Sequence, residues 1–229
     1  MLTTPKIVGQ SVPRTDGPDK VTGAACYAAD LGLPDTLYGK LLRSPYPYAS
    51  IVEIDVSEAA RLPGVYGVIS GADLHGAMSG RRIFDMPVLA SSVVRFVGEP
   101  VAAVAAVDDA TARSALDRIK VVYEELPAVF EPAEASAADA PILHPGFNEY
   151  FGVKPRDVPS NVYATMTWGQ GDIEDGFGAA DVVVEGTYSA SAVHQMYLES
   201  HTCLVRCTEA GGMEVWASNK APHSVKRQI

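Results

Sequence analysis

The sequence has few of the features that would suggest a disulfide framework, a membrane span or a nucleic-acid-binding surface. Its three cysteines are an odd and sparse set, which does not suggest a disulfide framework. No apolar run approaches the roughly 20 residues of a membrane span, and the first residues lack the apolar core of a secretory signal. Lysine and arginine number 18 against 28 acidic residues, and this net charge of −10 argues against nucleic-acid binding. We therefore expect a cytoplasmic protein with no membrane or nucleic-acid partner.

The most informative stretch is FVGEPVAAVAAV, residues 96–107. The small apolar residues after its Gly-Glu-Pro turn show no period, which predicts a strand buried on both faces. Asp108 is suited to cap a helix over residues 110–119, and strand-like residues 120–124 follow. Strand, helix and strand in this order predict a crossover unit in a mixed sheet. The helix would bury one apolar stripe, made of Ala112, Ala115, Leu116 and Ile119.

Other segments have the patterns of strands or helices, in a composition of 47% hydrophobic and 20% charged residues that is ordinary for a globular protein. Strands are predicted at residues 24–28, 36–43, 49–56, 65–70, 163–169, 181–189, 195–207 and 213–217. Helices are predicted at residues 57–62, 132–138 and 172–178.

Proline- and glycine-rich stretches divide the chain into four parts. Residues 1–20 are predicted to form an extended arm, and residues 21–135 the first domain. An Ala-, Glu- and Pro-rich linker is expected at residues 136–160, and a second domain segment at residues 161–229. In a glycine-containing loop of the first domain, Arg81 and Arg82 are suited to clamp a carboxylate or phosphate, or else belong to a solvated loop.

Two runs resemble a known family. FVGEPVAAVAA and, after a short helix, IKVVYEELPAV are similar to the hammerhead domain in the large subunit of molybdenum hydroxylases. This is the xanthine dehydrogenase, aldehyde oxidase and carbon monoxide dehydrogenase family. The family's opening motif has its counterparts in Val8-Gly9, Pro13-Arg14, Asp16 and Lys20-Val21-Thr22-Gly23. The start of the family's molybdopterin-binding domain is matched by Gly171-Asp172, Phe177, Ala180 to Glu185, Leu198-Glu199, His201 and Trp216 to His223.

The resemblance implies an α+β (mixed α/β) fold, with a hammerhead domain followed by part of a molybdopterin-binding domain. It also implies a subunit or fragment of an enzyme that oxidises an aldehyde or N-heterocycle with water-derived oxygen. The cofactors would be molybdopterin with molybdenum, shared with a partner chain, and 2Fe-2S clusters and FAD on partner subunits. The remaining molybdopterin-domain polypeptide, an iron–sulfur subunit and an FAD subunit are the expected partners.

In the family, the glycine-rich loop, most pterin contacts and the catalytic glutamate lie beyond the matched region. No catalytic residue is therefore assigned here, and the isolated chain is expected to be inactive. Lys220 stands where the family has a glutamine that approaches the metal-bound oxygen. Lys220 and the adjacent Asn219 are the predicted cofactor-binding residues, with a surface position near a strand end as the alternative. A cation in place of an amide leaves open whether hydroxylase chemistry is preserved.

A metal site is not predicted. His194, His201, Cys203 and Cys207 lack the close pair spacing of structural zinc sites, and strand cysteines are more often packed as small hydrophobic residues. A second function also stays open, namely a non-catalytic, truncated hammerhead domain that serves as a structural or protein-binding module. The sequence leaves undecided the substrate, the oligomeric state and whether the chain is a natural split subunit or a truncation.

Overall fold

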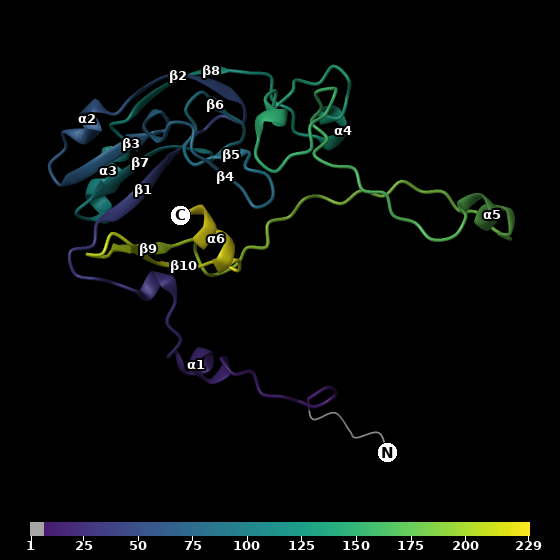
Figure 1. The fold of residues 1–229 in the computed structure, drawn as a ribbon, viewed down its shortest axis with the longest axis horizontal. Coiled ribbons are helices and arrows are strands. Elements are labelled where there is room, and N and C mark those ends of the chain that lie inside the picture. Colours follow the sequence, from purple (N-terminus) through teal and green to yellow (C-terminus); the bar gives the residue numbers. More distant parts are fainter. Residues whose placement is uncertain (1–6) are drawn as a thin grey trace. The chain divides into compact units, whose positions relative to one another are not determined.

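The structure is a computed structural model and describes residues 7–229, so the first six residues of the predicted arm lie outside the described residues. The chain forms two compact units (Figure 1). The larger unit consists of residues 35–187. The smaller unit combines the described residues up to 34 with those from 188 onward, apart from Gln228.

The first sheet of the larger unit has β7 (Pro100–Ala106) at its centre, between β1 (Tyr38–Arg43) and β3 (Val65–Ser70). Both neighbours pair with β7 in the antiparallel sense. Four side chains of β7 are buried, and three of them, Ala102, Val104 and Ala106, share one core with Ala112 and Ala115 of the helix that packs on this sheet. The predicted strand is confirmed, but its burial is complete only on the face of Ala102, Val104 and Ala106, since Ala103 and Ala105 are half-buried.

Helix α3 (Asp109–Leu116) packs on β1 and β7. It begins where Asp108 accepts a hydrogen bond of 2.7 Å from the backbone N–H of Thr111, as the sequence predicts. The predicted apolar stripe is also confirmed: Ala112 and Ala115 are fully buried, Ile119 is 8% exposed and Leu116 packs against the same core.

A second sheet has the order β6 (Val93–Val94), β2 (Ala49–Asp55) and β8 (Lys120–Glu125). The predicted parallel crossover is wrong, because β7 and β8 belong to different sheets and every strand pairing in residues 7–229 is antiparallel. Both edges of β7 are already paired with β1 and β3. Strand β8 therefore pairs with β2 instead.

Shorter elements complete the larger unit. The loop after β8 is held in place by side chains: Arg95 donates through Nε to the carbonyl of Leu143 at 2.9 Å, and Asn161 accepts from the N–H of Leu143 at 2.9 Å. The short elements are α2 (Ser57–Ala60), η2 (Gly71–Leu74), β4 (Met78–Ser79), β5 (Met86–Pro87), α4 (Pro132–Ala135) and η3 (Phe147–Glu149).

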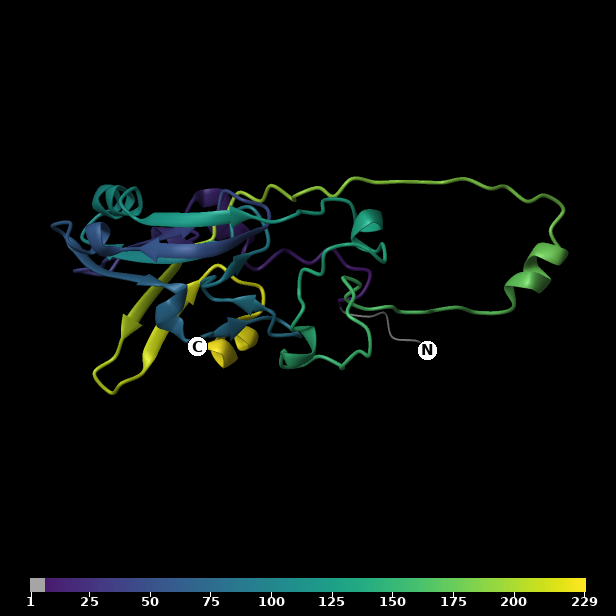
Figure 2. The same ribbon diagram turned by 90° about the horizontal axis from the view of Figure 1, so that it is seen from above.

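Residues 161–187 form a long excursion with α5 (Ile173–Gly178) near its tip (Figure 2). Asp172 caps this helix through the N–H groups of residues 174 and 175, so the predicted helix is confirmed. The strands predicted at residues 163–169 and 181–189 are wrong for the described chain, since no strand forms there. A strand requires a partner for its N–H and C=O groups, and the described residues supply none to these segments.

In the smaller unit, α1 (Gly17–Thr22) interrupts the predicted extended arm. The strand predicted at residues 24–28 is wrong, because Asp30 accepts a hydrogen bond of 2.9 Å from the N–H of Tyr27 and the chain turns into η1 (Ala28–Asp30). Among residues 7–229, no helix combines the length and apolar character needed to cross a bilayer.

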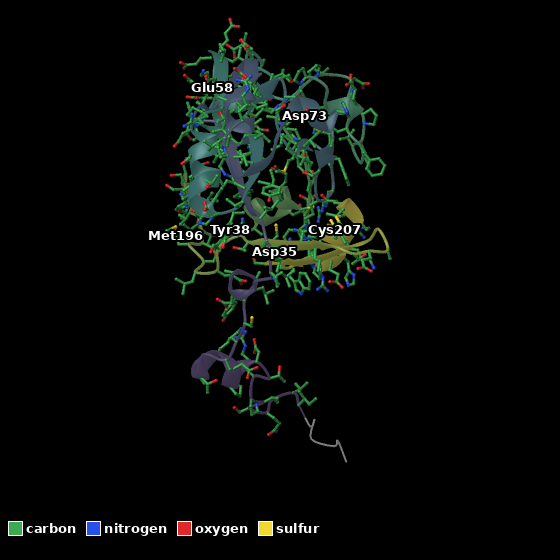
Figure 3. The ribbon with its side chains drawn as sticks, turned by 90° about the vertical axis from the view of Figure 1, so that its left-hand side faces the viewer. Asp35, Tyr38, Glu58, Asp73, Met196 and Cys207 are labelled. Atoms are coloured by element: carbon green, nitrogen blue, oxygen red, sulfur yellow. The ribbon has the colours of Figure 1, made fainter. Side chains whose placement is uncertain are left out.

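The predicted hairpin of the smaller unit is confirmed. Strand β9 (Cys203–Cys207) pairs antiparallel with β10 (Met213–Ala217), and α6 (Pro222–Gln228) follows. The strand predicted over residues 195–207 forms only in its last five residues. Met196, labelled in Figure 3, has a left-handed backbone with φ of +52°, which interrupts the extended conformation before β9.

Candidate functional site

Asn219 and Lys220 lie in the short connection between β10 and α6. The side-chain oxygen of Asn219 accepts a hydrogen bond from the backbone N–H of Ala221, which fixes this turn and leaves the amide NH₂ group as a donor. Lys220 is exposed and forms no ion pair within residues 7–229. Its charge is therefore available to whatever approaches this turn.

Both residues line an open hollow of about 520 Å³ in the smaller unit. The segment before β9 forms the opposite side and contributes Glu199 and His201, both of which belong to the family-like motifs of the sequence. The hollow thus combines a cation, a carboxylate, an imidazole and several amide or hydroxyl groups. Its full lining consists of Gln195, Tyr197, Glu199, His201, Ser218, Asn219 and Lys220.

Ser218 holds the two sides of this hollow together. Its Oγ donates to the carbonyl of Ser200 at 3.1 Å and accepts from the N–H of Thr202 at 3.3 Å. Its backbone N–H donates to the carbonyl of Thr202 at 3.2 Å. These contacts continue the β9–β10 pairing by one step, and they explain why residues about 20 positions apart meet at one hollow.

Tyr197 is a residue of the site that the sequence alone does not reveal. Its hydroxyl lies 2.7 Å from Nε2 of His201, and the two rings stack with centroids 5.4 Å apart. The ring of His194 lies 5.2 Å from that of Tyr197 on a tilted plane. The only signal in the sequence is the four-residue spacing from Tyr197 to His201. The contact orients His201 at the hollow.

The two strand cysteines, Cys203 and Cys207, are exposed free thiols (Cys207 in Figure 3). The interpretation of these cysteines as packed hydrophobic residues is therefore wrong for the described chain, since both lie exposed on β9. Within residues 7–229, no group of three or more His, Cys, Asp or Glu side chains is placed to hold a metal ion.

The donors around the hollow fit one edge of an oxygen-rich cofactor. The ammonium group of Lys220 and the amide groups of Asn219 and Gln195 are all hydrogen-bond donors, and such donors match oxygen and ring-nitrogen acceptors. The opposite lining, with Glu199 and the Tyr197–His201 pair, offers acceptors and a hydroxyl. The arrangement can bind and orient a polar group on one side.

Two family descriptions match the chain. Residues 22–127 match the a/b hammerhead domain of aldehyde oxidase and xanthine dehydrogenase. Residues 153–229, which contain the hollow beside Lys220, match the molybdopterin cofactor-binding domain. The chain belongs to the large-subunit family of molybdenum hydroxylases. It carries the hammerhead domain and part of a molybdopterin-binding domain, which confirms the predicted α+β architecture.

Individual relatives agree with this assignment. The chain is 35% identical over 217 residues to a probable xanthine dehydrogenase subunit of Bacillus subtilis, covering 94% of this chain and 27% of the relative. It is 32% identical over 229 residues to the nicotinate dehydrogenase large molybdopterin subunit of Eubacterium barkeri, covering 98% and 50%. The chain thus spans between about a quarter and a half of the length of these curated relatives.

The fold is shared with a solved structure of a copper- and molybdenum-containing CO dehydrogenase in its carbon monoxide-reduced state. The TM-score is 0.79 at 29% identity, over 96% of this chain and 29% of the other.

Proposed function

We propose that this chain is the scaffold part of a molybdenum hydroxylase whose reactive centre is completed by further polypeptide. The observation that carries the proposal is the match of residues 153–229 to a molybdopterin-binding domain, in a chain that spans a quarter to a half of its relatives' length. The catalytic glutamate and most pterin contacts would lie on the additional polypeptide. When bound, molybdopterin with its molybdenum would supply the transfer of water-derived oxygen to an aldehyde or N-heterocycle.

Exposed apolar side chains in residues 166–198 support the need for additional polypeptide. Met166 and Trp168 are each 92% exposed, Tyr188 is 90% exposed and Leu198 is fully exposed. Side chains of this size are normally covered, and an extended backbone without a partner strand invites pairing with another segment. We propose that the remaining molybdopterin-domain polypeptide pairs with this stretch and covers it.

At the cofactor edge, the proposed binding residues are Lys220 and Asn219. Lys220 would donate to an oxygen of the bound cofactor or substrate, and the NH₂ group of Asn219 would do the same from a turn fixed by Ala221. Ser218 would keep these donors in place through its contacts with Ser200 and Thr202. Their roles are binding and orientation, and no proton transfer is assigned to them.

We further propose that the complete enzyme includes an iron–sulfur subunit and an FAD subunit that carry electrons away, and that it assembles in the cytoplasm. The cysteines support assembly in the cytoplasm. Cys26, Cys203 and Cys207 are all free and exposed thiols, which suits a reducing compartment.

Co-expression tests the proposal. The tagged chain would be produced with the polypeptides encoded next to it, purified, and measured for co-purifying subunits and for molybdenum by mass spectrometry. We expect stoichiometric partners and bound molybdenum. The substitution Val184→Asp, at a side chain that is 82% exposed in the excursion, should reduce the recovery of partner at least about fivefold.

The matched control is Val52→Asp on β2, where the side chain is 62% exposed. It places the same charge on the hammerhead domain and should leave partner recovery unchanged. A chain that stays a well-behaved monomer and acquires neither partner nor molybdenum would overturn the proposal and would favour the non-catalytic module instead.

A further inference from the structure

The larger unit contains an open hollow of about 670 Å³ with a strongly positive lining. It lies between residues 82–83 and residues 147–165. Three cationic side chains line it, those of Arg82, Lys154 and Arg156, and the lining contains no aspartate or glutamate. Such a concentration of positive charge is unexpected in a chain with a net charge of −10.

Tight backbone packing joins the two sides of this hollow. The N–H of Phe84 donates to the carbonyl of Phe151 at 3.1 Å, and their rings meet edge to face with centroids 5.5 Å apart. Gly152 has φ of +88°, and a Cβ there would collide with the carbonyl oxygen of Arg82. Glycine is therefore required for this close approach, which sets Arg82 beside the 147–165 segment.

Arg156 is held in a fixed position. Its guanidinium donates to the carbonyl of Ser160 at 3.2 Å and to that of Tyr163, and lies 4.0 Å from the centroid of the Phe147 ring. Its backbone exchanges two hydrogen bonds of 2.9 Å with the side chain of Asn148. A guanidinium has five N–H donors, so most remain after these contacts. Because both acceptors are neutral, the positive charge is not compensated.

Arg82 and Lys154 are exposed and, like Arg156, form no ion pair within the described residues 7–229. The nearest acidic neighbour in sequence, Asp157, lines an adjacent hollow rather than this one. Three cationic residues therefore line one concave surface without a carboxylate among the lining residues.

We propose that this hollow binds a small organic phosphate. A phosphate group carries nearly two negative charges and three acceptor oxygens, so it can engage three separate cations at once. A carboxylate carries only one negative charge, so it would balance less of the positive charge of this lining. The volume lies in the range of small-molecule sites, and Ile83, Val153 and Val162 provide an apolar wall for an organic group attached to the phosphate.

The inference is independent of the proposed function, because it uses only residues 82–165 and no molybdenum chemistry. It is tested on the complete native assembly that contains this chain, or on the full chain if that purifies alone. The probe is phenyl phosphate, with benzoate and inorganic phosphate as comparison ligands, and binding is measured by isothermal titration calorimetry at fixed ionic strength.

We expect saturable binding of one phenyl phosphate per chain, with benzoate and inorganic phosphate each at least about tenfold weaker. Arg82→Gln and Lys154→Gln should each weaken phenyl phosphate binding about tenfold, as the loss of one charged hydrogen bond predicts. Both side chains are exposed and have no ion-pair partner in the described chain, so neither change should disturb folding. The matched control is Arg81→Gln, which removes the neighbouring charge but does not line the hollow, and should change binding less than about twofold.

Three results would overturn the proposal. One is the absence of saturable phenyl phosphate binding. Another is equal weakening by Arg81→Gln, which would indicate unspecific attraction to surface charge. The third is tighter binding of benzoate, which would assign the hollow to carboxylates.

Discussion

The carboxylate of Glu99 is buried and accepts a 2.5 Å hydrogen bond from the backbone N–H of Arg95. This contact closes the turn that leads into β7, and the carbonyl of Glu99 accepts a second bond of 2.9 Å from the N–H of Ser44. Burial raises the pKa of Glu99 above its ordinary value of 4.5, and it outweighs the opposing effects of the Arg95 N–H and the Arg95 charge. The chain thus buries an acid at the entry of its central strand, where the N–H of Arg95 needs an acceptor.

The raised pKa gives the stability of the fold a predictable dependence on pH. Because the folded state disfavours the charged form of Glu99, its contribution is greatest below pH 4.5 and is lost as the pH rises through the folded-state pKa. Glu99→Gln keeps an acceptor for Arg95 but cannot ionise. Its advantage over the natural protein in free energy of unfolding, measured in urea, should therefore grow as the pH rises through the folded-state pKa of Glu99 and should then level off.

Glu99→Ala is the control for the hydrogen bond itself. It leaves the N–H of Arg95 without its acceptor and, like Glu99→Gln, cannot ionise, so its free energy of unfolding should lie about 1–3 kcal/mol below that of Glu99→Gln at every pH. If the difference in free energy of unfolding between Glu99→Gln and the natural protein did not change with pH, the burial of the charge would not control stability at this turn.

Small side chains between α3 and the central sheet allow close packing, and enlarging one should be costly. Ala112 is fully buried against β7, so Ala112→Leu should lower the free energy of unfolding by about 1–3 kcal/mol through overpacking. The control Ala110→Leu lies on the exposed side of the same helix and should change it by less than about 0.5 kcal/mol. Equal effects of the two changes in chemical denaturation would contradict this packing.

These two regions also show what the sequence could predict. Strand β7 and helix α3 follow from local signals, namely the uninterrupted run of small apolar residues, the Asp108 cap and the 3.6-residue stripe. Their assignment to sheets could not be predicted in the same way. Whether β8 joins the sheet of β7 depends on which edges distant strands already occupy, and no local pattern carries that information.

The strand predictions for residues 163–169 and 181–189 were wrong for a related reason. Their composition favours strands, but a strand exists only with a hydrogen-bonded partner, and the described residues provide none. At the hollow beside Lys220, the resemblance to a family gave the two turn residues but not Tyr197. The positive hollow depends on Arg82 lying beside a segment about 70 residues later in the chain, and this proximity comes from the packing of Gly152.

Gly71 is a second position where close backbone approach decides the residue. A Cβ there would lie 2.5 Å from the carbonyl oxygen of Ala90, so the two segments could not stay at their present separation. Gly71→Ala should lower the free energy of unfolding by about 1–3 kcal/mol, seen as a lower urea midpoint. Gly67→Ala, earlier in the chain on β3 and with open space around the new methyl group, should be neutral. A similar loss of unfolding free energy in Gly67→Ala would argue against a local clash at Gly71.

The charge of Lys220 is predicted to attract anionic groups of molecules that enter the hollow it lines. Because Lys220 forms no ion pair within the described residues, it should attract an anionic group on the substrate of the assembled enzyme, given the proposed function. Lys220→Gln should raise KM for a carboxylate-bearing substrate about 5–10-fold, with less effect on kcat and little on a neutral analogue. Steady-state kinetics at two ionic strengths measures KM and kcat for the carboxylate-bearing substrate and for its neutral analogue.

Two further variants distinguish this role from a general loss of surface charge. Lys220→Arg keeps the cation and should restore most of the affinity for the anionic substrate. Lys226→Gln removes an equivalent exposed charge from α6, outside this hollow, and should leave KM unchanged. If Lys220→Gln and Lys226→Gln gave the same kinetics for both substrates, Lys220 would be an ordinary surface residue near a strand end. A change confined to Lys220, rescued by arginine and weakened by salt, would place its charge at the substrate's anionic group.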